Sequence, residues 1–380
     1  MTARLGRLVV EGLRSIRRME LELTTDVTVL IGANGSGKSS LMSALELVAR
    51  IWDDSFQDYL RECDGVDRLL FADRAGTADR ILIELMLEPD AEGNRSGYSA
   101  RLRPSPPGDS EPAWLQERHL IQTGRSRDSI HSEVLYEGPH SPIHLLTQSE
   151  ASGRLHDLAV HLRPLLEGCR VFHFHNTSAA QGWSTVGDDT ALRANAENIA
   201  AYLLKVRQEH PEHYQRIVAA IRQAAPFFDD FVLAPGASEQ VRLWWRQRGA
   251  ERILMAHETS DGTLRFICLA ALLLGPNLPA TVVLDEPELG LHPTAIGLLA
   301  EMTHAVGRNG HRVIMATQSA PLLSHYELDE VLVLDRVDGA TAVSRPDAKV
   351  LKAFVEDCST GTLWEMNLLG GRPAHEGAVL

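Results

Sequence analysis

A glycine-rich stretch near the N-terminus has the residue types and the spacing that hold a phosphate group. Residues 32–39 read GANGSGKS and match the phosphate-binding pattern G-x-x-x-x-G-K-[ST]. Its glycines let backbone N–H groups turn inward onto a phosphate, because no Cβ stands in the way. The candidate ligands of a nucleoside triphosphate are Gly32, Asn34, Gly35, Ser36, Gly37, Lys38, Ser39 and Ser40.

Two side chains of this stretch have specific chemical tasks. The Lys38 ammonium would reach the β- and γ-phosphates, and the Ser39 hydroxyl would ligate Mg²⁺. The apolar, β-branched run Val27–Ile31 in front of the loop predicts a buried strand. A helical pattern follows from Lys38 to about Arg50, and the positive N-terminal end of that helix would face the same phosphate.

A second group of chemically competent residues lies far downstream. Residues 281–288 read TVVLDEPE, an apolar run that ends in adjacent carboxylates. Buried parallel strands have this composition, and α/β sheets bind ligands at the carboxyl ends of their strands. Asp285 would hold Mg²⁺. Glu286, which strand alternation aims elsewhere, would act as the general base on the attacking water.

Two more stretches place polar residues at the ends of apolar elements. Residues 258–263 read ETSDGT and precede the run LRFICLAALLLG, so that Ser260 or Asp261 can cap a buried helix. The run Arg312–Ala316 predicts another buried strand, and it is followed by Thr317, Gln318 and Ser319.

The remaining helices and strands are predicted from the spacing of hydrophobic residues and from the prolines and glycines that interrupt it. Alternating or apolar runs predict strands at 5–13, 19–23, 81–87, 98–102, 134–136, 170–174, 231–233, 241–245 and 331–335. Helical patterns predict helices at 155–162, 195–208 and 211–224 and from about Thr294, the first of which is expected to stop before Pro164. No heptad pattern persists, so no long coiled-coil arm is predicted.

Composition bounds the class of protein. The chain has 380 residues, of which 44% are hydrophobic and 23% charged, and this is typical of a globular protein. The formal net charge of −14 argues against a free-standing DNA-binding surface, which is usually basic. Four scattered cysteines and the lack of a signal peptide or a membrane-spanning run predict a cytoplasmic location with no membrane contact.

Three features leave alternatives open. His173, His175 and Asn176 lie at the end of the predicted strand 170–174 and suggest a metal site. No cysteine or carboxylate follows at ligand spacing, however, so a polar loop near the nucleotide is favoured over a zinc site. Arg14 fits a solvated turn better than a contact with phosphate or base. The Trp244–Trp245 pair fits core packing better than base stacking.

The order of these motifs resembles the ABC-type ATPases of the RecF, SMC and OLD group. The short bacterial AAA-family ATPases of defence and toxin–antitoxin systems are particularly similar. The resemblance is carried by the phosphate-binding loop, VFHFHNTS, SDGTLRF, LDEPELGLHP, Thr317-Gln318-Ser319 and the terminal LWEMNLLGGRP. It implies a P-loop α/β fold with an ABC-type head, which combines a mixed β-sheet core, an antiparallel β subdomain, a helical insert and no long coiled coil.

The resemblance also implies a mechanism and a set of ligands. Two protomers would pair head to tail around ATP and Mg²⁺, with Ser260, Asp261 and Gly262 reaching the partner's γ-phosphate. Glu286 would be the general base, and Gln318 would take the place of the usual switch histidine. A Q-loop glutamine is not evident, and His175 or Asn176 would stand in for it. Residues 1–175 and 240–345 would form the ATPase core, 176–239 a helical insert lobe, and 346–380 a C-terminal helix and tail.

Three functions fit these observations. The favoured hypothesis is an ATPase that controls a separate effector, a nuclease or a toxin, in anti-phage defence, with possible sensing of double-stranded DNA. The alternatives are a RecF-like DNA repair ATPase and the energising subunit of a transporter. The S-D-G-T sequence at 260–263 and the lack of an aromatic base-stacking residue argue against the transporter.

Overall fold

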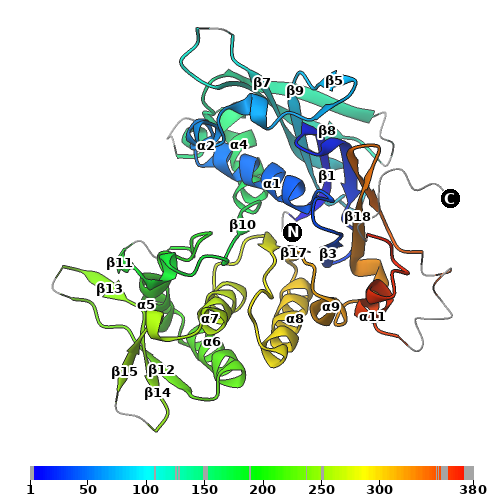
Figure 1. Cartoon of the computed structure of the whole chain (residues 1–380). Helices are drawn as coiled ribbons and strands as arrows, with labels where there is room; N and C mark the ends of the chain where they lie inside the picture. The colour runs from blue at the N-terminus through cyan, green and yellow to red at the C-terminus, as the bar shows by residue number, and fades with distance from the viewer. Residues whose placement is uncertain are drawn as a thin grey trace.

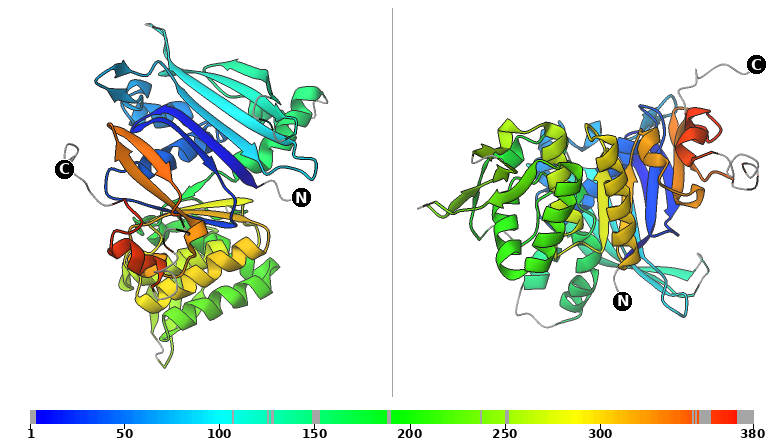
Figure 2. Two further views of the ribbon diagram at one scale, coloured as in Figure 1. Left: turned by 90° about the vertical axis from the view of Figure 1, so that its right-hand side faces the viewer. Right: turned by 90° about the horizontal axis from the view of Figure 1, so that it is seen from below.

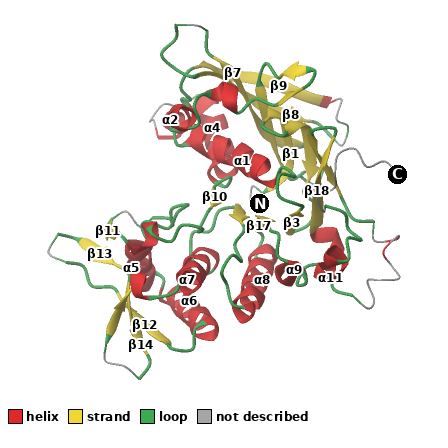
Figure 3. Ribbon diagram, in the orientation of Figure 1, coloured by secondary structure: helices red, strands yellow, loops and turns green. Residues whose placement is uncertain are grey.

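Two six-stranded sheets organise the chain (Figure 1). The computed structural model describes residues 4–371 except 107, 125, 127–128, 149–152, 188–189, 237, 250–251, 348, 350 and 352–357. One sheet is antiparallel and the other is largely parallel. Helices lie on both faces of the parallel sheet (Figure 3), with α1 and α4 on one side and α7, α8 and α9 on the other. This arrangement confirms the predicted P-loop α/β fold.

The central sheet has the strand order β10-β16-β17-β3-β18-β19, in which only β19 runs antiparallel to its neighbour. Its strands are β3 (Val27–Ile31), β10 (Val171–Phe172), β16 (Thr281–Asp285), β17 (Arg312–Ala316), β18 (Val331–Val337) and β19 (Ala340–Ser344). Alternate side chains enter two different cores: Val29 and Ile31 face α7 and α8, while Leu30 faces α1 and α4. Burial on both faces explains why these strands read as unbroken apolar runs.

The antiparallel sheet has the order β2-β1-β6-β7-β8-β9. Its strands are β1 (Leu5–Leu13), β2 (Ile16–Glu22), β6 (Ile81–Leu87), β7 (Arg95–Pro104), β8 (Ala113–Gln122) and β9 (Ile130–Gly138). The sequence reasoning missed β8, because its buried face carries Glu117 and His119 among the apolar residues. The Tyr98 hydroxyl donates to the Glu117 carboxylate at 2.6 Å, which satisfies one oxygen of this buried acid.

Helices α1 (Lys38–Trp52), α2 (Phe56–Glu62), α3 (Ile143–Gln148) and α4 (Arg154–Glu167) accompany this sheet. The prediction that the fourth helix stops before Pro164 was wrong. A proline at this position removes the hydrogen bond to the carbonyl of Val160, whose residue is 46% exposed. Leu165 and Leu166 beyond the proline are almost fully buried, so core packing extends the helix past its breaker.

A second lobe is built from helices and small sheets. It contains α5 (Ile199–Glu209), α6 (Pro211–Ala224), β11 (Trp183–Thr185), β12 (Phe228–Val232), β13 (Gln240–Arg242), β14 (Trp244–Gln247) and β15 (Ile253–Met255). Strand β13 pairs with β11, and β14 pairs with both β12 and β15. The division of the chain into domains stays a prediction. The strand pairing favours an insert lobe that extends beyond residue 240 and carries strands as well as helices.

The remaining elements complete the layer beneath the central sheet and its far edge. They are α7 (Asp261–Leu273), α8 (Pro293–Arg308), α9 (Ala320–Leu323) and α11 (Thr360–Glu365). The short pair β4 (Ala72–Asp73) and β5 (Gly76–Thr77) lies beside the antiparallel sheet, where Asp73 pairs with Arg17 of β2 at 2.6 Å. The hairpin β18–β19 lies beside β2 (Figure 2, left) and so links the two large sheets. None of the described helices combines the length and the apolar composition that crossing a membrane requires.

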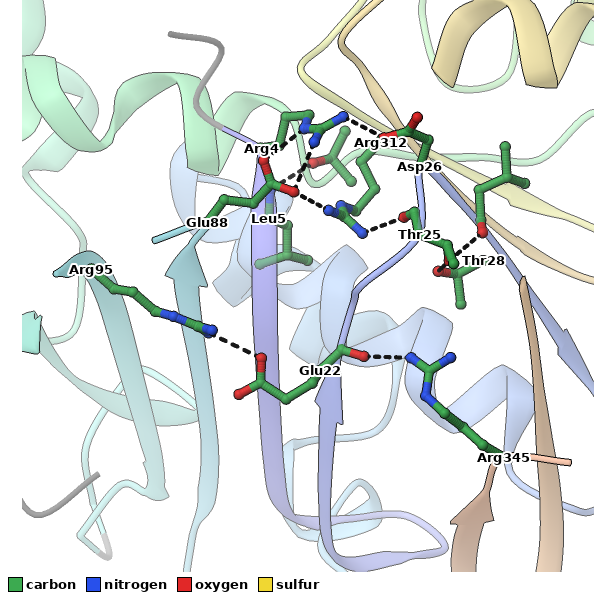
Figure 4. Close-up of polar contacts among 12 residues, drawn as sticks. Arg4, Leu5, Glu22, Thr25, Asp26, Thr28, Glu88, Arg95, Arg312 and Arg345 are labelled. Carbon is green, nitrogen blue, oxygen red and sulfur yellow. Dashed lines mark hydrogen bonds and ion pairs between the residues drawn. The ribbon is translucent and has the colours of Figure 1, made fainter. Parts of the chain in front are cut away.

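A buried arginine also ties the two sheets together (Figure 4). Arg312, at the start of β17, is 1% exposed and donates to the carbonyl of Thr25 at 2.5 Å and to the Glu88 carboxylate. Glu88 follows β6 and also accepts from Arg4, which in turn pairs with Asp26 at 2.8 Å. The carboxylate of Glu88 therefore lies between two guanidinium groups, one from each end of the chain.

We expect Arg312→Ala to destabilise the protein, because it removes a buried charge from an ion pair and leaves the Thr25 carbonyl without its donor. The expected loss is about 3 kcal/mol of unfolding free energy, measured by urea denaturation. Arg103→Ala is the matched control, since its ion pair with Glu137 is exposed and should contribute less than about 1 kcal/mol. Equal losses in the two variants would contradict this account.

Candidate functional site

The predicted phosphate-binding loop and the predicted acidic strand end meet at one pocket. The carboxyl ends of β3, β16 and β17 are neighbours in the central sheet, because these strands are parallel. The pocket at this edge has a volume of about 420 Å³. It is lined by Arg14, Ser15, Asn34, Gly35, Gly37, Lys38, Ser39, Ser40, His175, Asp285, Glu286, Gln318 and Arg336.

Close approaches explain the glycines of the loop. Gly32 and Gly37 have positive φ angles of 151° and 112°. A Cβ on Gly32 would lie 2.2 Å from the Leu334 carbonyl oxygen, and one on Gly37 would lie 2.0 Å from the Thr341 Oγ1. Gly35 also has a positive φ, 81°, but no atom of the described part of the chain lies within 4 Å of its Cβ position. The loop is therefore held against the hairpin β18–β19 at its first and last glycines.

Lys38 is folded back onto the loop. Its ammonium donates to the carbonyls of Gly32 at 2.5 Å and Ala33 at 3.1 Å. Burial lowers the pKa of this ammonium, and the nearby carboxylates of Glu286 and Asp285 raise it in opposition. The Ser36 Oγ is buried, and among the residues that the structure describes it has no hydrogen-bond partner. A partly desolvated cation and the backbone amides of a glycine-rich loop fit a bound polyphosphate, which would supply the negative charge.

A chain of hydroxyl groups links the start of α1 to the turn after β1 and to β19. The Ser15 Oγ lies 2.8 Å from the Ser40 Oγ and 2.8 Å from the Thr341 Oγ1, so that three distant segments share one chain of hydrogen bonds. Arg14 is an exposed turn residue, as predicted, and it lines the pocket together with Ser15. The sequence reasoning also missed Arg336 and Thr341, because nothing local indicates that the hairpin β18–β19 reaches the loop.

The acidic pair separates as strand alternation requires. Asp285 ends β16 and points toward His173, whose Nδ1 is 3.5 Å from the Asp285 Oδ2. Glu286 has left the strand with a left-handed φ of 41°, a conformation that is costly for a residue with a side chain. The Gln318 Nε2 donates to the Glu286 Oε1 at 2.8 Å. Sequence reasoning singled out all three side chains, and the fold brings them to one pocket.

The histidine loop contributes to the same pocket. His175 is part of its lining, whereas the Asn176 side chain accepts hydrogen bonds from the backbone and hydroxyl of Ser178. Of the two candidates for the missing Q-loop residue, His175 is therefore the one that faces the pocket. No carboxylate follows these histidines at ligand spacing along the chain, but the fold brings one beside them. The carboxylate is Asp285, which lies on the neighbouring strand and far away along the chain.

The residues at 260–262 lie elsewhere. Ser260 caps α7 and accepts a hydrogen bond from the Thr263 N–H at 3.2 Å, as predicted. Asp261 accepts from the Thr177 hydroxyl at 2.8 Å, and a Cβ on Gly262 would lie 2.1 Å from the Gly290 carbonyl oxygen. These three residues are absent from the lining of the nucleotide pocket. Ser260 and Asp261 are exposed at the surface.

Two buried charged residues connect these parts, and the sequence reasoning did not single them out. Arg265, which is 5% exposed in α7, donates to the carbonyls of Phe174 at 2.8 Å and His175 at 2.9 Å. Glu288 accepts from the Thr317 hydroxyl, and burial raises the pKa of its carboxyl. In the sequence, Arg265 is a single charge at the start of an apolar run, and Glu288 follows two other carboxylates; neither pattern by itself indicates a buried charge.

We expect Gly37→Ala to lower ATP affinity by about tenfold or more, since a Cβ at φ 112° against Thr341 would shift the start of α1 and Lys38 with it. A fluorescent nucleotide titration measures the change. Gly35→Ala is the matched control, because it shares the positive φ but has open space around it. If both variants lose affinity equally, backbone strain alone governs the loop and the contact with Thr341 is irrelevant.

Solved structures with a similar fold are SMC heads. The head of an Smc protein bound to the C-terminal winged-helix domain of ScpA matches with a TM-score of 0.60 and 12% identity, over 92% of this chain and 100% of that chain. Smc heads from Pyrococcus furiosus and Pyrococcus yayanosii match with TM-scores of 0.58 and 0.53, at 12% and 11% identity, over 93% of this chain and 99% of theirs. These likenesses show the fold.

A family model gives the closer assignment. No curated protein has a significantly similar sequence. The family described as "AAA domain, putative AbiEii toxin, Type IV TA system" matches residues 27–168 and 169–324, which is most of the chain. Together with the SMC-head fold, this match confirms the resemblance to AAA- and ABC-type ATPases of SMC and RecF type. The chain belongs to this AAA-domain family of ATPases.

Proposed function

We propose that the protein binds ATP between two protomers, hydrolyses it to ADP and phosphate, and thereby controls a separate effector protein. The observation that carries the proposal is the convergence of Lys38, Asp285, Glu286 and Gln318 on one pocket. A lysine, two carboxylates with different surroundings and a neutral amide are the groups that phosphoryl transfer to water needs.

Each residue has a role that its position supports. Lys38 and the loop amides would bind the phosphates, and Ser39 with Asp285 would hold Mg²⁺, which neutralises charge on the phosphate oxygens when bound. Glu286 would take the proton from the attacking water. Gln318 donates a hydrogen bond to Glu286 and would orient this carboxylate. Unlike the histidine usual at this position, a glutamine amide stays neutral, so it would not add a positive charge to the pocket.

Dimerisation is proposed from the position of the N-terminus of α7, which lies outside the pocket of its own chain. The N-terminus of α7, with Ser260 as its cap, is a donor site for an anion, but it is not part of the pocket of its own chain. Its exposed position leaves it accessible to a second protomer. In a head-to-tail pair, the Ser260 hydroxyl and the amides near Gly262 would complete the pocket of the partner, so that ATP joins the two heads and hydrolysis releases them.

An effector in anti-phage defence, a nuclease or a toxin, is the favoured output. The family description names a toxin and a type IV toxin–antitoxin system, and two of the similar Smc head structures contain a domain of ScpA. The net charge of −14 argues against tight, unassisted binding of double-stranded DNA and favours recognition through a partner. A RecF-like role in DNA repair is the alternative, and it would require direct activation by DNA.

We expect the purified chain to hydrolyse ATP in the presence of Mg²⁺, and Glu286→Gln to lower kcat by about 100-fold or more while ATP still binds. The general base is lost in this variant, but the phosphate ligands remain. Steady-state phosphate release, measured with and without linear double-stranded DNA at low and moderate salt, checks the rate. Lys38→Ala is the second variant, and it should lose nucleotide binding itself.

The DNA arm of this experiment separates the functional hypotheses. A rate that DNA does not change supports recognition through a partner, whereas strong stimulation at moderate salt supports the RecF-like alternative. Glu286→Gln with the full wild-type rate would remove Glu286 from the role of general base.

We expect Glu286→Gln to form dimers when ATP is added, because trapped ATP holds the two heads together. Ser260→Arg in the same background should abolish dimerisation, since a long cation would replace the helix cap at the proposed interface. Light scattering after size exclusion measures the mass. His131→Arg, at an exposed position on β9, is the matched control and should leave the dimer intact. ATP-dependent dimers that tolerate Ser260→Arg would contradict the proposed pairing.

A further inference from the structure

Two imidazoles and one carboxylate gather at the end of β10. One donor atom from each of His173, His175 and Asp285 can be chosen so that all three lie within 4.8 Å of one another. The Nδ1 of His173 is already 3.5 Å from the Asp285 Oδ2. An ion with bonds of about 2.1 Å draws its ligands to about 3 to 4 Å apart, a change that requires rotation of the half-buried His173 and the exposed His175 imidazoles.

Strand register accounts for this grouping. In the parallel pair β10–β16, Phe172 is opposite Leu284, so that the next residues along, His173 and Asp285, are also neighbours. Alternation along an extended segment then buries Phe174, which is 4% exposed, and aims His173 and His175 to the other side. The two imidazoles therefore share a face because the residue between them is committed to the core.

The loop that carries the histidines is held from two sides. The His173 N–H donates to the Ala194 carbonyl at 3.1 Å. The buried guanidinium of Arg265 holds the carbonyls of Phe174 and His175, and this contact leaves the imidazole of His175 free to face the pocket. The backbone that carries both ligands is thus held before an ion binds, so that only the two side chains remain to be ordered.

The ligand set identifies the kind of ion. Mg²⁺ prefers oxygen ligands and retains its waters, whereas imidazole together with carboxylate is the ligand set of first-row transition metals. We propose that His173, His175 and Asp285 form a binding site for a divalent transition-metal ion, of the series from Mn²⁺ to Zn²⁺, in the nucleotide pocket. This inference rests on the proposed ATP site, to which it adds a preference for a transition metal. Binding of the metal ion to the three side chains requires neither bound ATP nor its hydrolysis.

Mn²⁺ is the appropriate probe, because it is paramagnetic and is the weakest binder of the series. We expect the nucleotide-free protein to bind one Mn²⁺ per chain in a titration followed by electron paramagnetic resonance. A tenfold excess of Mg²⁺ should leave the ion in place, and Zn²⁺ should displace it, in keeping with the order of affinities. Pulsed spectra should show coupling to ¹⁴N of a coordinated imidazole.

The His173→Asn, His175→Asn double variant should weaken Mn²⁺ binding by at least tenfold and lose the ¹⁴N coupling. His131→Asn on the exposed face of β9 is the matched control and should retain both. Thermal unfolding of all variants establishes that they are folded. Asp285→Asn gives an independent test, since it should weaken Mn²⁺ binding while the two imidazoles remain.

Each outcome bears on one proposal. Absence of Mn²⁺ binding, displacement by Mg²⁺ in tenfold excess, or binding without ¹⁴N coupling would overturn the metal inference and leave the ATPase proposal standing if Mg²⁺-dependent hydrolysis is seen. Mn²⁺ held by the histidines in a chain that hydrolyses no ATP would support the metal site and overturn the proposed hydrolysis.

Discussion

The parallel pairing of β10, β16, β17 and β3 is the constraint from which the site follows. Parallel strands present their carboxyl ends at one edge, so four polar loops that are distant in the chain must meet there. The residues after each strand can then be chosen for chemistry, because the apolar residues before them, such as Val29 and Val283, hold the register from both sides. The pocket is thus a consequence of burial on two faces.

The phosphate-binding loop depends on contacts from the opposite end of the chain. Gly32 lies against Leu334, Gly37 against Thr341, and a Cβ on Gly371 would be 3.3 Å from the Gly32 Cα. The Gly371 N–H donates to the Asp335 carboxylate at 3.1 Å, which fixes the tail at this position. These contacts leave no room for side chains, and they make the geometry of the loop sensitive to the hairpin β18–β19. Any partner that moves this hairpin would act directly on the nucleotide site.

Sequence reasoning succeeded where a pattern is local and repeated. It placed β3, β6, β17 and α6 at the bounds that the structure shows, since each is a single apolar run or one amphipathic helix with clear breakers. It failed where tertiary packing outweighs a local signal. Core burial of Leu165 carried α4 through a proline, and the buried Glu117 disguised the inward face of β8. Local propensity is a weak prior when many buried contacts oppose it.

The same division holds for the chemistry. The phosphate-binding loop, the acidic strand end and the cap of α7 could be recognised from the chain alone, because spacing along one strand–loop–helix unit defines each of them. The grouping of His173 and His175 with Asp285 and the hydrogen bond between Gln318 and Glu286 were decided by strand order and register. These relations join residues that no sequence spacing connects, so they exist only once the sheet has brought their strands side by side.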